Sequence, residues 1–338
     1  MELRSAPDRR VVSNVWYGEP LGAELFDRPS GGYVSAVVSA VRLLSAAGRN
    51  GVVVTSEGAA RPIGIIALAL AYAVRRRRGL VILEFLPGLK TGRAGSAVRF
   101  FYRRLLRRAC LSIQVMTSWE RALYIEEYDL DPASVTHVPF YFYDDSSHRQ
   151  LTPDSARTGV FASGRSSCDW DLLIAAARGR SWNLTIVCSA EDHDDVVKSA
   201  AGTDIVIRTE ISEDEHADLL AAARVYVITL EDRPVSAGHV RIMGAATFET
   251  PVVVTDVRGL DGYKHLAAEV VPAGDVEQLR SAVERLLNDP DSRERERARV
   301  RAIARSNTRT DYLASIERLL NPGEASSLAQ QSSNTARA

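Results

Sequence analysis

The sequence has few lysines and no excess of positive or negative charge. These two features restrict the source and the binding partners that the sequence predicts. Only three basic residues are lysines, Lys90, Lys198 and Lys264, and the others are arginines, a bias typical of GC-rich bacterial genomes. The 42 basic residues are offset by 43 acidic ones. Because nucleic-acid binders usually carry a clear positive excess, no nucleic-acid partner is predicted.

Cysteine is also scarce, which argues against a metal or disulfide framework. Cys110, Cys168 and Cys188 are far apart and form no CxxC pair, so neither a zinc site nor a set of disulfides is expected. The cluster Glu191–Asp195 is better interpreted as an acidic first turn that offsets a helix dipole. No GxGxxG motif follows a predicted strand, which argues against a nicotinamide enzyme. We therefore expect no metal and no cofactor.

Long apolar runs are absent. The longest, residues 63–74, is shorter than the roughly 20 residues that a spanning helix needs. The first ten residues, MELRSAPDRR, have no apolar core and do not resemble a signal peptide. These features predict a cytoplasmic protein, with peripheral contact at the inner face of the membrane as an open alternative.

What the sequence does contain is a regular alternation of short β-branched runs and longer amphipathic ones. Such alternation predicts βαβ units and parallel sheets. The chain has 338 residues, which is too many for a single hydrophobic core. Strands are expected near residues 11–15, 51–55, 80–84, 111–115, 135–138, 159–162, 183–188, 204–208, 224–229, 251–255 and 269–271. Helices are expected near residues 32–47, 63–76, 94–108, 118–128, 169–178, 192–200, 212–222, 239–247, 275–288, 291–305 and 310–320.

The predicted fold class is α/β, with two Rossmann-like parallel-sheet domains facing a cleft. We expect an N-terminal domain at 1–145, a polar linker at 146–158, a C-terminal domain at 159–321 and a disordered tail at 322–338. The tail is rich in serine, glutamine and alanine. The last helix is expected to pack back on the N-terminal domain. Sheets of this kind bind ligands beyond the carboxyl ends of their strands.

Two segments at such strand ends carry candidate binding residues. In TLEDRPVSAGHVRIMG, a buried strand leads into Ser236, Ala237, Gly238 and His239, where Ser236 is a plausible N-cap. The free N–H groups of a helix start among small residues suit a diphosphate, although an ordinary capped helix has the same pattern. His239 could donate a hydrogen bond to phosphate or could be a plain helix residue.

In FASGRSSCDWDLLIAA, Gly164 allows a close backbone approach, and Arg165 could fork onto phosphate oxygens or be a solvated loop residue.

These two segments, together with LTIVCS, the helix after ISEDE and VVPAGDVEQLRSAVERLLNDP, resemble the donor-binding half of family-4-type glycosyltransferases. The resemblance covers residues 158–320 best and weakens before them. It implies a metal-independent, retaining GT-B enzyme that uses a nucleotide-diphosphate sugar. By resemblance, Arg165 would hold the diphosphate, the loop 236–239 would cap it, and Thr209 with the residues up to Ser212 would lie beside the base. Gly31 and Gly32 would face the acceptor and the transferred sugar.

The sequence departs from the family pattern at the donor loop. The family has two glutamates eight positions apart, and Ser236 and Gly244 stand at those places here. A glutamate at 244 would hold the donor ribose. The basic residue that often follows the Gly-Arg pair is replaced by Cys168 or Asp169, and the usual glycine before Pro251 is replaced by Glu249-Thr250. These departures indicate either a divergent donor site or a chain that has lost catalysis.

The first half offers weaker candidates. Glu84 ends a predicted buried strand within LVILEFLPG and is a candidate catalytic or acceptor contact, although a solvated strand-end glutamate has the same pattern. The basic amphipathic stretch at 99–109 suits an anionic membrane surface or a helix packed on a sheet.

The leading hypothesis is a glycosyltransferase that moves a sugar from a nucleotide-sugar donor to a hydroxyl acceptor with retention. The acceptor could be lipid-linked or a small molecule. The alternative is a degenerate GT-B protein that acts as a partner of an active transferase. An epimerase on the same scaffold rests on analogy alone.

Overall fold

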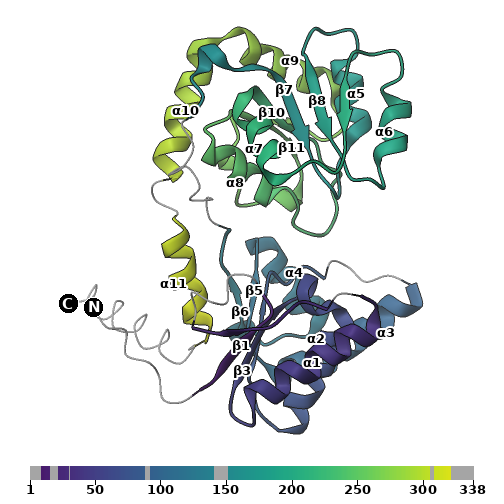
Figure 1. Ribbon diagram of the computed structural model, residues 1–338, viewed down its shortest axis with the longest axis vertical. Coiled ribbons are helices and arrows are strands. Elements are labelled where there is room, and N and C mark those ends of the chain that lie inside the picture. The colour runs from purple at the N-terminus through teal and green to yellow at the C-terminus, as the bar shows by residue number, and fades with distance from the viewer. Residues whose placement is uncertain are drawn as a thin grey trace, which may run out of the picture. The chain divides into compact units, whose positions relative to one another are not determined.

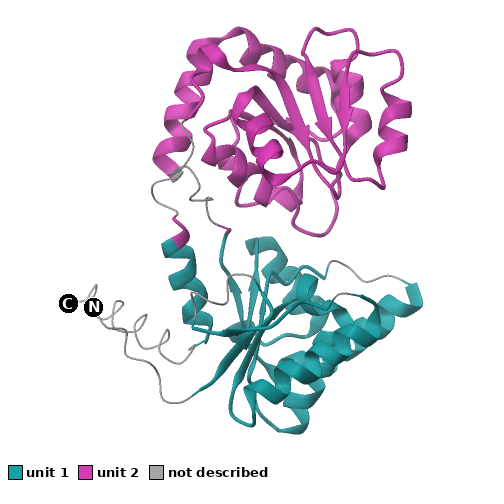
Figure 2. Ribbon diagram, in the orientation of Figure 1, with its two compact units in different colours: residues 1–139, 310–338 teal, residues 140–309 magenta. Residues whose placement is uncertain are grey.

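The computed structural model describes residues 9–15, 22–29, 31–87, 92–140, 151–304 and 308–320 (Figure 1). The chain divides into two compact units (Figure 2). Unit 1 is Met1–Pro139 with Thr310–Ala338, and unit 2 is Phe140–Arg309. The first part of the predicted linker (146–150), the N-terminal eight residues and the predicted tail at 322–338 lie outside the described residues. The other part of the predicted linker, from 151 to 158, belongs to unit 2.

Each unit is built on a six-stranded parallel sheet with helices on its faces, which confirms the predicted fold class for each unit. In unit 1 the strand order is β2-β1-β3-β4-β5-β6. Its elements are β1 (Val11–Ser13), β2 (Glu24–Leu25), α1 (Tyr33–Ala47), β3 (Val52–Ser56), α2 (Glu57–Val74), β4 (Leu80–Leu83), α3 (Gly92–Ala109), β5 (Cys110–Val115), α4 (Ser118–Tyr128), η2 (Pro132–Ser134), β6 (Val135–His137) and α11 (Arg309–Leu320).

The core of unit 1 lies between the sheet and its helices. Strands β3 and β4 are buried along their whole length, as expected for central parallel strands covered on both faces. An aromatic cluster closes one side: Phe85 lies 5.6 Å from Tyr124 and 5.8 Å from Tyr102 and from Tyr128, measured between ring centroids. Edge-to-face packing of this kind adds to the free energy of burial.

Helix α2 is the one helix among the described residues with the length and apolar composition of a membrane span. It packs between α1 and α3, and Ile65, Leu68 and Tyr72 are fully buried in the core of unit 1. The helix begins at Glu57, six residues before the predicted start. Arg61, just before Pro62, has a non-helical φ of 57° and produces a kink near the beginning.

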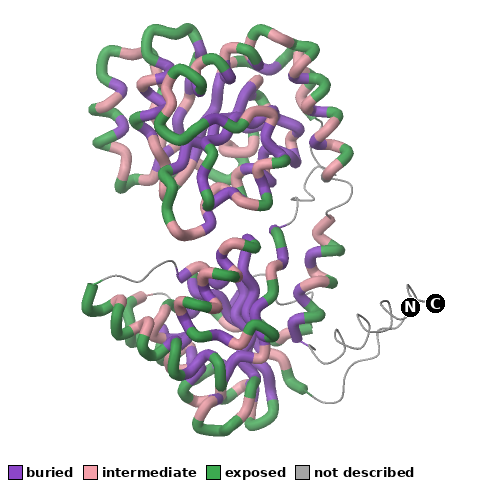
Figure 3. Tube along the Cα trace, turned by 180° about the vertical axis from the view of Figure 1, so that it is seen from behind, coloured by how far each residue is buried: buried purple, intermediate pink, exposed green. Residues whose placement is uncertain are grey.

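Unit 2 has the strand order β12-β11-β10-β7-β8-β9, again all parallel. Its elements are η4 (Asp154–Ala156), β7 (Thr158–Ser163), α5 (Trp170–Ala177), β8 (Leu184–Val187), α6 (His193–Ser199), β9 (Val206–Arg208), α7 (Glu213–Ala222), β10 (Ala223–Ile228), α8 (His239–Thr247), β11 (Val252–Asp256), η5 (Arg258–Leu260), η6 (Lys264–Leu266), β12 (Glu269–Pro272), α9 (Val276–Asn288) and α10 (Pro290–Ala304). Buried residues follow the central strands of each sheet (Figure 3).

The last two helices belong to different units. Helix α10 packs on α8 and α9 in unit 2. Helix α11 lies in unit 1 apart from its first residue, and there the Gln114 amide donates a hydrogen bond of 3.2 Å to the Tyr312 hydroxyl.

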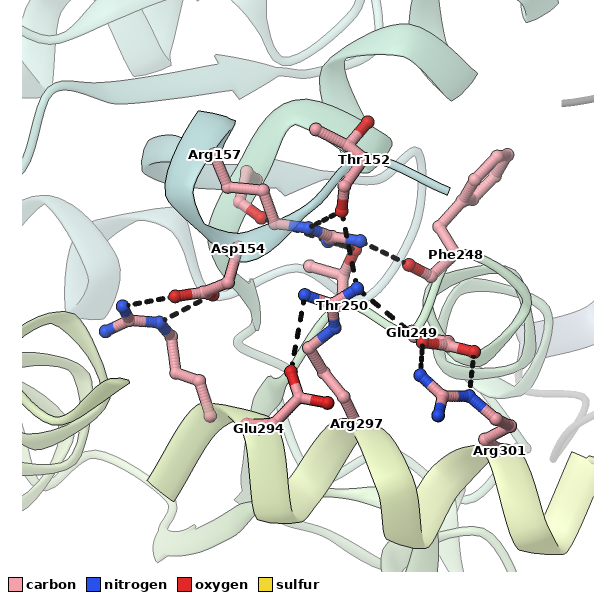
Figure 4. A network of polar contacts seen from close by, with 11 residues as sticks. Thr152, Asp154, Arg157, Phe248, Glu249, Thr250, Glu294, Arg297 and Arg301 are labelled. Carbon is pink, nitrogen blue, oxygen red and sulfur yellow. Dashed lines mark hydrogen bonds and ion pairs between the residues drawn. The ribbon is translucent and has the colours of Figure 1, made fainter. Parts of the chain in front are cut away.

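A polar network fixes the start of unit 2 and α10 to the end of α8 (Figure 4). Arg157 is fully buried and donates to the Phe248 carbonyl at 2.7 Å and to the Thr250 hydroxyl at 2.8 Å. Arg293 forms a forked pair with Asp154, at 2.9 and 2.7 Å. Buried guanidinium groups are tolerated when their donors are satisfied in this way.

Glu249 is the carboxylate at the other end of this network (Figure 4). It accepts two hydrogen bonds of 2.6 Å from Arg301 and lies 3.6 Å from Arg297. Its φ of 53° is in the left-handed region, where glycine is favoured. A glutamate therefore occupies the place of the family's usual glycine because its side chain is held by two arginines of α10.

Candidate functional site

The two predicted binding segments lie together at the carboxyl edge of the sheet in unit 2. One follows β7 and the other follows its neighbour β10. Backbone hydrogen bonds join them: the Asp169 N–H donates to the Thr229 carbonyl at 3.1 Å, and the Glu231 N–H donates to the Ser167 carbonyl at 2.9 Å. This edge is where parallel α/β sheets bind ligands.

Helix α8 begins one residue after Gly238, and Gly238, not Ser236, is its N-cap. The prediction of a Ser236 cap was wrong because the chain turns back at Gly238, with φ of 81°, before the helix starts. A Cβ at Gly238 would lie 3.0 Å from Leu230 and 3.1 Å from Leu260, so glycine is needed there. The Ser236 side chain is buried in the loop.

The start of α8 has no side-chain cap. The Ala237 N–H is already used, since it donates to the Gly259 carbonyl at 3.1 Å. The N–H groups of residues 239–241 precede the first helical hydrogen bond, which the Ile242 N–H donates to the Gly238 carbonyl at 2.9 Å, and no side chain caps them among the described residues. They are therefore available to an anion at the positive end of the helix dipole.

Arg241, in the first turn of α8, lies against Gly164. Its guanidinium donates to the Ser163 carbonyl at 2.8 Å and lies 3.4 Å from the Cys168 sulfur. A Cβ at Gly164 would lie 2.4 Å from Nη1 of Arg241. The Cys168 side chain would also clash with such a Cβ, so the side chains of Cys168 and Arg241 both pack closely on the backbone of Gly164.

Arg241 has no carboxylate partner among the residues that the structure describes. The sequence interpretation missed it, although its place in the first turn after the small-residue loop was a usable signal. Its contact with Cys168 matters because Cys168 or Asp169 stands where the family pattern has a basic residue. A cation therefore does lie beside the Gly-Arg loop, but it comes from α8.

Arg165 is exposed and has no hydrogen-bond or ion-pair partner within the described parts of the chain. Beneath it, the Ser163 hydroxyl lies 2.8 Å from Nε2 of His216 and 2.6 Å from the Tyr226 hydroxyl. Burial lowers the pKa of His216, and the charge of Arg165 lowers it further. At neutral pH, the imidazole of His216 is therefore uncharged and contacts Ser163 at the end of β7, close to the guanidinium of Arg165.

His239 faces an aromatic environment. Its ring lies 5.9 Å from Phe140 and 5.7 Å from Tyr263, and burial together with the Arg241 charge lowers its pKa to about 4. At neutral pH the imidazole carries no charge to offer a phosphate. Its Nδ1 is buried without a hydrogen-bond partner among the described residues.

Thr209 and Gly244 lie at the edges of this site. Thr209 follows β9, and its hydroxyl is buried without a partner in the described structure. Gly244 lies in α8, and a Cβ there would meet only Leu220, at 3.9 Å, so a larger side chain has room. The structure shows no group that replaces the family's glutamate at this position.

The candidates of unit 1 lie at the carboxyl edge of its own sheet. Gly31 and Gly32 precede α1, where Gly32 is the N-cap, and a Cβ on either would meet nothing within 4 Å. Glu84 follows β4 with a φ of 47°, and its N–H donates to the Gln114 side chain at 3.2 Å. A glutamate in this strained conformation at a strand end is a reason to suspect function.

Comparison with known families and structures agrees with this geometry. Residues 169–289 match the model of the family described as "Glycosyl transferases group 1". No curated protein is detectably similar in sequence.

Solved structures with the same fold are similar over most of this chain. HepE from Anabaena in complex with UDP has 13% identity and a TM-score of 0.65, with 95% of this chain and 92% of that chain covered. A UDP-forming α,α-trehalose-phosphate synthase from Burkholderia xenovorans has 13% identity and a TM-score of 0.64, with 85% and 76% covered. TarM has 11% identity and a TM-score of 0.63, with 86% of this chain and 58% of that chain covered. This chain therefore spans less than two thirds of the length of TarM.

The matched family segment contains α8 and its loop, the part of the chain where the two binding segments meet. The similar structures share the two-sheet fold, which is the GT-B fold. Residues 169–289 therefore resemble a group 1 glycosyltransferase domain, and the chain has the GT-B fold.

Proposed function

We propose that this protein transfers a sugar, with retention, from a nucleotide-diphosphate donor to a hydroxyl acceptor. The observation that carries the proposal is the meeting of Arg165, Arg241 and the uncapped start of α8 around the Gly164 loop. Neither arginine has a carboxylate partner among the described residues. Two guanidinium groups without a carboxylate partner, beside a helix N-terminus, form a site for a diphosphate.

In this proposal the site acts by electrostatic stabilisation. When the bond between the anomeric carbon and the diphosphate breaks, its electron pair stays on the departing diphosphate. The guanidinium groups of Arg165 and Arg241 and the first-turn N–H groups of α8 offset that charge without reorganising. No metal is required, so transfer should continue in the presence of a chelator.

The family resemblance and the comparisons suggest where to begin with the donor. HepE was solved with UDP, and the trehalose-phosphate synthase is described as UDP-forming. UDP-sugars are therefore the first donors to test. The buried, unpartnered hydroxyl of Thr209 is available to the base or ribose.

The acceptor side is assigned to unit 1. We place the acceptor and the transferred sugar near Gly31 and Gly32, with Glu84 as the weak candidate for a catalytic contact. A cytoplasmic enzyme that contacts the inner face of the membrane through its basic helix at 99–109 would suit a lipid-linked acceptor, while a small acceptor would need no such contact.

The second candidate function is a partner of an active transferase, without catalysis of its own. Ser236 and Gly244 in place of the two family glutamates favour it. Arg165 and Arg241 oppose it, because a purely structural chain has no need to keep two cations without carboxylate partners beside an uncapped helix.

The test is an assay for released nucleoside diphosphate with each UDP-sugar, with and without simple hydroxyl acceptors. Turnover that falls in Arg165→Ala supports the proposal, and the anomeric configuration of any product, read by NMR, decides retention. Tight donor binding without release or transfer would favour the partner function.

A further inference from the structure

Seven arginines line an open recess in unit 1. The recess has a volume of about 730 Å³ and lies between the end of α2 and the end of α3. Its charged lining consists of Arg76, Arg77, Arg78, Arg103, Arg104, Arg107, Arg108 and the single carboxylate of Asp129. The whole chain has a net charge of −1, so this positive excess is strictly local.

Some of these arginines form hydrogen bonds or ion pairs within unit 1. Arg77 contacts Asn50, Arg78 pairs with Asp131 at 3.1 Å, and Arg103 donates to the Glu127 carbonyl at 2.8 Å. These contacts explain why arginines occur at those positions. They do not neutralise the recess, since Arg77 and Arg103 meet neutral groups.

The side chains of three other arginines form no such contact among the described residues. Arg76, Arg104 and Arg108 are exposed and have no hydrogen-bond or ion-pair partner among the residues described. Arg107 lies 3.7 Å from Asp129, which is itself exposed. Like charges gathered around one recess repel each other unless an anion enters.

The recess is separate from the proposed transferase site. Arg76–Arg78 directly precede β4, and Arg107 and Arg108 directly precede β5. All strands of this sheet are parallel, so the recess lies at their amino edge, whereas Glu84 follows the carboxyl end of β4. A ligand in the recess would therefore not occupy the donor or acceptor positions.

Exposed apolar side chains flank the arginines. Phe100, one turn before Arg104 in α3, is 63% exposed and packs edge-on against Phe101, which is also exposed. Val74, at the end of α2 beside the recess residue Ala73, is 73% exposed. Arginines next to exposed aromatic and aliphatic side chains suit an anionic headgroup whose chains lie alongside.

We propose that the arginine recess binds a phosphate ligand with two or more negative charges, such as a diphosphate or the phosphomonoester headgroup of an anionic lipid. Guanidinium forks match phosphate oxygens, and several of them together prefer a doubly charged group to a monovalent ion. The free side chains of Arg104 and Arg108, one turn apart on α3, are the central ligands.

The test is calorimetric titration of the full chain with inorganic pyrophosphate at fixed ionic strength. Arg104→Glu/Arg108→Glu should weaken binding by at least about tenfold. The matched control, Arg42→Glu/Arg49→Glu, reverses two exposed arginines at α1 and should bind as the parent does. Because pyrophosphate can also enter the donor site, Arg165→Ala/Arg241→Ala is titrated too and should keep the recess binding.

Vesicles then identify the source of the phosphate. Sedimentation with phosphatidate vesicles that is lost in the Arg104/Arg108 variant assigns a lipid headgroup, and pyrophosphate binding without sedimentation assigns a soluble phosphate ligand. If the charge reversal lowers the melting temperature, Arg104→Gln/Arg108→Gln replaces it. Equal pyrophosphate affinity in the recess variant and the control would overturn the proposal, whatever the donor-site variant does.

Discussion

At the scale of single residues, Arg241 is the most informative side chain of the donor site. It supplies a cation beside Cys168, one of the two positions at which the family pattern has a basic residue in the loop. The sequence locates Arg241 in the first turn of α8 but does not give the direction of its side chain, because that direction depends on how the turn meets the end of β7. Its contact with the backbone of Gly164 is a tertiary feature.

Arg241→Ala should therefore weaken nucleoside diphosphate binding. A charge-assisted hydrogen bond contributes about 1.5–3 kcal/mol, so the dissociation constant should rise by about ten- to a hundredfold. Isothermal titration with the diphosphate that binds best measures this. Arg180→Ala is the control, since Arg180 pairs with Glu284 at an exposed position of unit 2. Equal affinities in the two variants would show that Arg241 is not part of the site.

Gly244 allows a test in the opposite direction. A Cβ there has space, so Gly244→Glu should be accommodated and should restore the ribose contact expected from the family. The variant should bind a nucleoside diphosphate more tightly while its affinity for pyrophosphate stays the same. Gly244→Ala separates the helix effect, about 1 kcal/mol of stability, from the effect of the carboxylate. An unchanged nucleotide affinity in Gly244→Glu would mean that the ribose lies elsewhere.

His239 predicts a pH dependence of stability. Its folded-state pKa of about 4 lies below the ordinary value of 6.5. Between these values the unfolded chain binds a proton that the folded chain does not, so the free energy of unfolding falls as pH drops from 6.5 toward 4.

The His239→Phe variant should lack this part of the pH dependence. Between pH 6.5 and 4, its free energy of unfolding should therefore fall by a few kcal/mol less than that of the parent. Urea unfolding at a series of pH values measures it, with exposed His265→Phe as control. A slope equal to that of the parent would contradict the buried neutral imidazole.

At the scale of elements, the Glu249 network determines how α10 is held on unit 2. Glu249 and Arg297 have side chains that are each 6% exposed, so removing the carboxylate leaves a buried cation with less compensation. Glu249→Ala should cost about 3–5 kcal/mol, whereas Glu269→Ala, which breaks the partly exposed pair with Arg285, should cost less than about 1 kcal/mol.

Glu249→Gly adds a second comparison at the same position. It loses the same ion pairs but relieves the left-handed backbone, so it should be about 1 kcal/mol more stable than Glu249→Ala. Chemical denaturation of the three variants measures these differences. Equal stabilities of Glu249→Ala and Glu269→Ala would show that the network contributes no more than a surface pair.

The elements themselves were largely predictable from the sequence. Buried parallel strands such as β3 and β10 appear as continuous β-branched runs, and α4 and α8 were predicted with the bounds that the structure has. Strand β2 was not predicted, because two exposed residues, Glu24 and Leu25, carry no periodic signal. The cap of α8 was misplaced because serine is the commoner N-cap, and only the turn at Gly238 decides the start.

At the scale of the whole molecule, the charges are concentrated at particular places although the chain is nearly neutral. Unpaired arginines occur at the carboxyl edge of the sheet in unit 2 and at the amino edge of the sheet in unit 1. The family resemblance located Arg165 of the first group but not Arg241. The sequence could not locate the second group, because the recess forms only when the ends of α2 and α3 come together.

The most direct test of the central claim is a thermal-shift screen of the purified protein against UDP, GDP, ADP, TDP and their common sugars. We predict that one nucleotide stabilises the fold, by about 2.7 kcal/mol at a hundredfold excess over its dissociation constant, and that Arg165→Ala/Arg241→Ala removes the shift. The absence of a shift with every nucleotide, or the same shift in the double variant, would contradict the proposed diphosphate site.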